Sequence, residues 1–176
     1  MCVAPVNEQA SAIAAVRKPI DTTVCAVLSD PAAFNNKMVR IRAYYWGNEE
    51  NYTLKDRRCD GALWFWYAGG ALNGLGSEDP EGKQVLPVPV SLARDFKLER
   101  FEKLVRLNPE QMVPLIGEPA QHVTATFVGR IDSVSSEVHE FLKQHATEHW
   151  GLGFGHLGGY EAELILQYVA DDATVE

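Results

Sequence analysis

The sequence of 176 residues lacks any apolar run long enough to cross a bilayer, so it predicts no membrane-spanning helix. Positive charge is also scarce, because 16 Lys and Arg stand against 24 Asp and Glu, a formal net charge of -8. Such a charge repels nucleic acids and anionic membranes at long range. Nucleic acid is therefore an unlikely partner unless a local basic patch overcomes the repulsion.

Motifs for the commonest enzyme chemistries are missing too. The sequence holds no phosphate-binding loop, no nucleophile elbow and no CxxC pair. The acidic run at residues 78–81 lacks the alternating oxygen ligands of a calcium-binding loop. We therefore expect no cofactor.

Residues 153–160, GFGHLGGY, contain the G-x-G-x-x-G spacing that dinucleotide-binding folds place between a strand and a helix. Here the preceding segment has a helical pattern and Tyr160–Val169 has the pattern of a strand. Too few residues follow to complete a βαβ unit. We interpret the glycines as a loop that needs positive φ values before the last strand, and we predict no dinucleotide binding.

Hydrophobic periodicity predicts both strands and helices. Strands are predicted at 37–46, 52–55, 62–67, 122–131 and 160–169, with a sixth over 85–90. Helices are predicted at 24–28, 92–107 and 137–149. Because few helices separate the strand runs, the pattern favours a mostly antiparallel α+β fold. We expect residues 1–21 to form a tether or peripheral helix and residues 22–176 to form one domain.

The sharpest catalytic motif is HATEH at residues 145–149, which matches H-x-x-E-H. Inverted zinc peptidases place two such histidines on one helical face as metal ligands, and the glutamate activates water. A zinc-dependent hydrolase with ligands His145 and His149 and catalytic Glu148 is therefore one alternative function. The competing interpretation is that His145 borders the core, because it continues an apolar helical stripe through Leu142.

A second candidate site is the outward face of the first long strand. Its members are Arg40, Arg42, Tyr44 and Trp46. Arginines beside stackable aromatic rings are typical of proteins that bind single-stranded nucleic acid, and residues 37–58 hold six basic and three acidic side chains. Since such proteins usually have a basic overall balance, we favour a solvated strand face whose arginine stems cover the aromatic rings.

Five stretches of the sequence resemble one group of proteins. They are TVCAVLSDPAAFNNKMVRIRAYY, YTLKD, CDGALWFWY, VTATFVGRI and GFGHLGGYEAELILQYV. This pattern of packing and turn residues, over about residues 22–56, 59–67 and 122–169, is similar to small bacterial envelope or secreted proteins with an OB-fold-like barrel. The resemblance implies a five- to six-stranded barrel with peripheral helices. It also implies a location in the periplasm or cell envelope, with the cytoplasm as the alternative, and it leaves the activity open. The function we favour is a non-enzymatic binding or interaction module with an unknown protein or small ligand.

The three cysteines fit this resemblance. An odd count needs an explanation in an extracytoplasmic protein. In an OB-like arrangement the helix with Cys25 would lie near the start of the third strand, beside Cys59, so the two could form a disulfide. Cys2 would remain as a site of lipid attachment and as the expected contact with a membrane. The alternative is that Cys25 and Cys59 are buried and reduced.

Overall fold

The computed structural model describes residues 18–47, 52–67, 91–107, 121–145 and 151–176. In chain order the elements are β1 (Ile20–Thr22), α1 (Val24–Ser29), α2 (Pro31–Phe34), β2 (Lys37–Gly47), β3 (Tyr52–Lys55), β4 (Leu63–Trp66), α3 (Phe96–Leu107), β5 (Val123–Ser133), α4 (Ser136–Gln144), the 3-10 turn η2 (His156–Gly158), β6 (Ala162–Val169) and β7 (Thr174–Val175). The sixth strand predicted over 85–90 lies outside the described residues.

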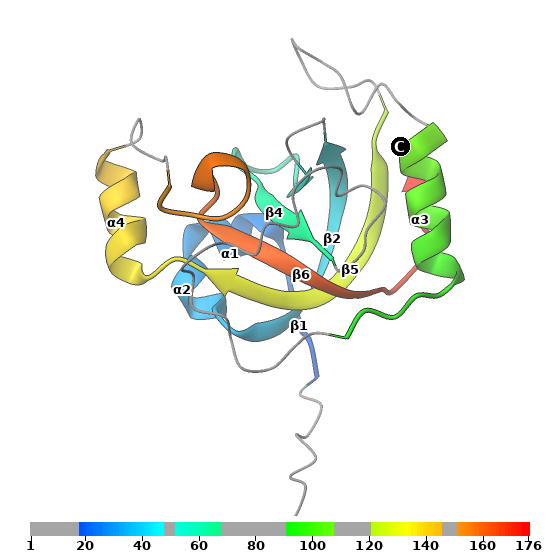
Figure 1. Cartoon of the computed structure of the whole chain (residues 1–176), viewed down its shortest axis with the longest axis horizontal. Coiled ribbons are helices and arrows are strands. Elements are labelled where there is room, and N and C mark those ends of the chain that lie inside the picture. The colour runs from blue at the N-terminus through cyan, green and yellow to red at the C-terminus, as the bar shows by residue number, and fades with distance from the viewer. Residues whose placement is uncertain (1–17, 48–51, 68–90, 108–120, 146–150) are drawn as a thin grey trace, which may run out of the picture.

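Five strands close a barrel in the order β2–β3–β4–β6–β5, because β5 returns to pair with β2. The short strands β1 and β7 add to β2 and β5, and α3 and α4 flank the barrel on opposite sides (Figure 1). The α+β barrel predicted from the sequence is therefore present.

The direction of the strands corrects one prediction. The sheet is mixed rather than mostly antiparallel, since β1 pairs with β2 and β4 pairs with β6 in parallel. A parallel pair needs a crossover connection. Here α1 and α2 connect the first pair, and the chain through α3, β5 and α4 connects the second. Hydrophobic alternation reports which face of a strand is buried and carries no information about the direction of its neighbour.

Strand β2 follows the predicted alternation. Its inward side chains are buried, with at most 4% exposed: Val39, Ile41, Ala43 and Tyr45. On the other face Arg40 and Arg42 are exposed. Tyr44 departs from the pattern, because it is only 6% exposed and its ring lies 4.3 Å from that of His122.

Helix α3 places Phe101 in the core, where its ring makes edge-to-face contacts with Phe65 and Phe127. The helix begins at Phe96 rather than at Leu92, because the Asp95 carboxylate accepts hydrogen bonds from the backbone N–H groups of the first turn.

A buried hydrogen bond also joins α3 to the barrel. The Tyr67 hydroxyl donates to Oε1 of Glu102 at 3.2 Å, and both side chains are buried. Burial, and then the Glu102 carboxylate, raise the pKa of Tyr67 well above its usual value. The hydroxyl therefore remains a donor across the physiological pH range.

We expect Tyr67→Phe to lower the free energy of unfolding by about 1–2 kcal/mol, because a buried carboxylate loses a donor while the ring packing is kept. Urea denaturation measures the change. The control is Tyr168→Phe, which alters a partly exposed tyrosine and should change stability by less than about 0.5 kcal/mol. Equal stability of the two variants would show that the Tyr67–Glu102 bond contributes nothing.

The glycine-rich segment is a loop between α4 and β6, as predicted. Gly155 and Gly158 have φ values of 68° and 65°. A Cβ atom at Gly155 would lie 2.3 Å from the Trp64 ring, and one at Gly153 would lie 2.0 Å from the carbonyl oxygen of Tyr160. Gly155 thus allows the loop to pack closely on Trp64 of the barrel, whereas Gly153 and Gly158 allow close packing within the loop itself.

Candidate functional site

The predicted pair Cys25 and Cys59 forms a disulfide with a Cα–Cα distance of 5.7 Å. Cys25 is held in place by α1, whose N-cap residue Thr23 accepts a hydrogen bond from the backbone N–H of Ala26. Cys59 precedes β4, so the bond fixes α1 to the barrel. Disulfides form and persist in oxidising compartments, which indicates a location outside the cytoplasm.

None of the described helices combines the length and apolarity needed to cross a membrane.

An open pocket of about 230 Å³ lies on the outer face of the barrel. It is lined by Arg42, Ala43, Tyr44, Lys55, Asp56, Arg57, Arg58, Thr124 and Glu176. Strand register explains how distant parts of the chain meet here. Tyr44 is paired with Lys55 of β3 on one side and with Thr124 of β5 on the other.

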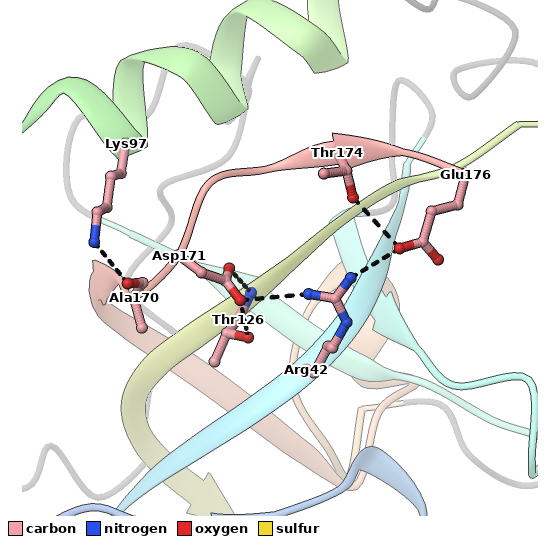
Figure 2. Close-up of polar contacts among 7 residues, drawn as sticks. All are labelled: Arg42, Lys97, Thr126, Ala170, Asp171, Thr174 and Glu176. Carbon is pink, nitrogen blue, oxygen red and sulfur yellow. Dashed lines mark hydrogen bonds and ion pairs between the residues drawn. The ribbon is translucent and has the colours of Figure 1, made fainter.

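Arg42 forms one end of the pocket and contacts two carboxylates, as Figure 2 shows. Its guanidinium donates to Asp171 at 3.3 Å and to Glu176 at 2.8 Å. Asp171 is fixed in turn, because it accepts hydrogen bonds from the backbone N–H of Thr126 at 2.7 Å and from its hydroxyl at 2.6 Å. Asp171 therefore orients Arg42 across the strands.

Residues 170–176, here called the strap, bring Glu176 to the pocket. Lys97 of α3 donates to the carbonyl oxygen of Ala170 at 2.6 Å (Figure 2). The backbones of Glu176 and His122 exchange two hydrogen bonds of 2.8 and 2.9 Å. The strap is thus held by α3 at its start and by β5 at its end.

The other cations of the pocket differ in how far their charge is neutralised. Arg58 donates to Asp56 at 2.8 Å, and its hydrogen bonds lower the pKa of Asp56, so this acid is ionised at neutral pH and balances Arg58. The Lys55 ammonium lies 4.4 Å from the centroid of the Trp46 ring. Neither Lys55 nor the exposed Arg57 forms an ion pair with a described residue. Within the described residues, Lys55 and Arg57 are thus the two cations of the pocket that have no carboxylate partner.

The predicted binding face and the lining of the pocket share only some of their residues. Arg42 and Tyr44 line it. Arg40 lies beside β1, with its guanidinium 3.8 Å from Asp21. Trp46 lies under Lys55 and outside the lining. Lys55, Arg57 and Arg58 were visible in the sequence as a basic cluster, whereas Thr124 and Glu176 come from segments that only the strand register brings to this place.

The histidine motif lies elsewhere. Helix α4 ends at Gln144, and His145 has left the helical region with φ -127° and ψ 56°. Its ring stacks on Phe141, with centroids 4.3 Å apart. H-x-x-E-H chemistry needs both histidines on one helix, and His145 does not meet that requirement. Glu148 and His149 lie outside the described residues, as does Cys2.

The described part of the chain contains no cluster of three or more His, Cys, Asp or Glu side chains placed to hold a metal ion.

Comparisons with protein-family models, with curated proteins and with solved structures found no match to this chain. The chemistry of the pocket is therefore inferred from its own geometry. Cationic side chains beside an aromatic ring in an open hollow are groups that bind an anionic ligand.

Proposed function

We propose that this chain is a non-enzymatic binding module of the bacterial cell envelope that holds a small anionic ligand in the pocket described above. The observation that carries the proposal is the pocket itself. Four cationic side chains gather there with three acidic ones, Asp56 and Glu176 in the lining and Asp171 against Arg42, on a chain whose net charge is -8. Positive charge that is concentrated in one place, on a chain whose net charge is negative, favours a specific ligand site there.

We propose further that the barrel is OB-like. The closed order β2–β3–β4–β6–β5 supports this, because an OB-fold is a five-stranded Greek-key barrel. Barrels of this class bind ligands on the outer surface of their strands and in the adjoining loops. The pocket lies on the outer surface of strands β2, β3 and β5.

The size and charge of the site favour a small anion over a nucleic acid. A volume of about 230 Å³ is below the roughly 300–1,000 Å³ typical of sites for drug-sized ligands. A polyanion would extend beyond the pocket along a chain whose net charge is -8 and would be repelled. A small ligand held in the pocket feels little of the charge that lies more than about 8 Å away, because salt screens it. Nucleic acid accordingly stays an unlikely partner in this proposal.

The proposed location is the periplasm or cell envelope. The Cys25–Cys59 disulfide supports export to an oxidising compartment. A lipid on Cys2 is the proposed means of membrane attachment.

The proposal predicts that glutarate, a small dicarboxylate, binds at low ionic strength and that Lys55→Gln with Arg57→Gln weakens its binding about tenfold. Two partly exposed charge contacts of about 0.7 kcal/mol each account for that factor. Isothermal titration calorimetry measures the affinity.

The matched control is Lys37→Gln with Lys103→Gln, which removes the same charge from exposed positions outside the pocket. We expect it to retain at least half of the wild-type affinity. The proposal fails if the wild-type protein binds none of glutarate, acetate and inorganic phosphate, or if the two double variants weaken binding equally.

A further inference from the structure

We infer that Glu176 is a built-in occupant of the anion site, and that the natural ligand is a small dicarboxylate, one carboxylate of which replaces Glu176 on Arg42. This inference rests on the proposed function. It adds the chemical class of the ligand and the residue that competes with it.

The two carboxylates on Arg42 are not equivalent. Asp171 is held by two short hydrogen bonds from Thr126, so it stays in place whatever occupies the pocket. Besides Arg42, the Glu176 carboxylate accepts a hydrogen bond of 3.3 Å from the exposed Thr174 hydroxyl. Its side chain is 48% exposed. Arg42 therefore has one fixed partner and one replaceable partner.

Glu176 can leave Arg42 without unfolding the strap. The backbone of Glu176 is paired with His122, and the buried Ala173 anchors the strap in the core. Rotation of the Glu176 side chain toward solvent breaks one exposed ion pair and leaves those contacts intact. The energy involved is small, because exposed ion pairs are weak.

The spacing of the cations favours two carboxylates rather than one compact anion. Arg42 lies two residues from Tyr44 on the same face of β2, and Lys55 is directly opposite Tyr44. Diagonal neighbours of this kind are about 7–8 Å apart, with their Cβ atoms somewhat closer. The charged groups turn away from each other, because the Lys55 ammonium lies over Trp46 and the Arg42 guanidinium faces Asp171 and Glu176. One carboxylate can therefore reach Arg42 while the second reaches Lys55 or Arg57.

The test compares glutarate, acetate and inorganic phosphate on wild-type protein, Glu176→Gln and Asp172→Asn. Asp172 is an exposed acid of the same strap and lies outside the pocket, so it controls for net charge. We expect Glu176→Gln to bind glutarate about two- to fivefold more tightly than wild type. Asp172→Asn should stay within about 1.5-fold of wild type, and in an Arg42→Gln background Glu176→Gln should give no gain.

Each result decides a separate point. If wild type binds glutarate and Glu176→Gln binds it equally or more weakly, the competition by Glu176 is refuted and the proposed function stands. If acetate or phosphate binds as tightly as glutarate, the dicarboxylate class is refuted. If neither wild type nor Glu176→Gln binds any of the three anions, the inference and the proposed function both fail.

Discussion

Removing the disulfide with Cys25→Ala and Cys59→Ala is expected to lower the free energy of unfolding by about 3–4 kcal/mol. The bond joins residues that are 34 positions apart, so it removes much chain entropy from the unfolded state. It also holds α1, a helix of 6 residues, and a helix this short is unstable alone. A loss of this size is a large part of the total stability of a domain.

Urea denaturation under non-reducing conditions measures the loss. Cys2→Ala is the control and should change the free energy of unfolding by less than about 0.5 kcal/mol. Free alkylation of both Cys25 and Cys59 in unreduced, denatured protein would contradict the bond itself. A loss below about 1 kcal/mol would contradict its contribution to stability.

Gly155→Ala is expected to cost about 2–5 kcal/mol, for two independent reasons. The φ value of 68° is strained for any residue with a side chain, at about 1–2 kcal/mol. The new Cβ atom would also lie 2.3 Å from the ring of Trp64, and such overpacking costs about 1–3 kcal/mol more. The loop or the tryptophan must then shift.

Gly151→Ala separates the two reasons. Gly151 has a φ of 79°, but a Cβ atom there would meet nothing within 4 Å. This variant should lose only the backbone contribution, about 1–2 kcal/mol. Thermal or urea denaturation of both variants gives the comparison. Equal losses would mean that the contact between the loop and Trp64 is not tight.

The structural features that were best predicted from the sequence are those that local residue patterns determine. The alternation in β2 identified its buried face, because side chains of a strand point to opposite sides in turn. The glycine loop was predicted because a strand, not a helix, follows it. The start of α3 was placed too early, because the apolar pattern alone does not show that Asp95 caps the first turn.

The features that could not be predicted from the sequence depend on pairing between distant segments of the chain. Arg42 and Tyr44 were identified as candidate binding residues, and both line the pocket. Glu176 could not be linked to Arg42, because 134 positions separate them and only the pairing of β7 with β5 brings them together. The parallel pairs were missed for the same reason. Residue types and periods indicate local structure, and the register between distant strands creates the site.

The most direct test of the anion pocket is an NMR titration of labelled protein with glutarate. Binding at the proposed place should shift the backbone amide signals of residues 42–44, 55–58, 124 and 176, and leave those of α4 and η2 unchanged. The account predicts that these shifts saturate together with a single affinity. Shifts confined to other parts of the barrel, or no saturable shift at all, would contradict it.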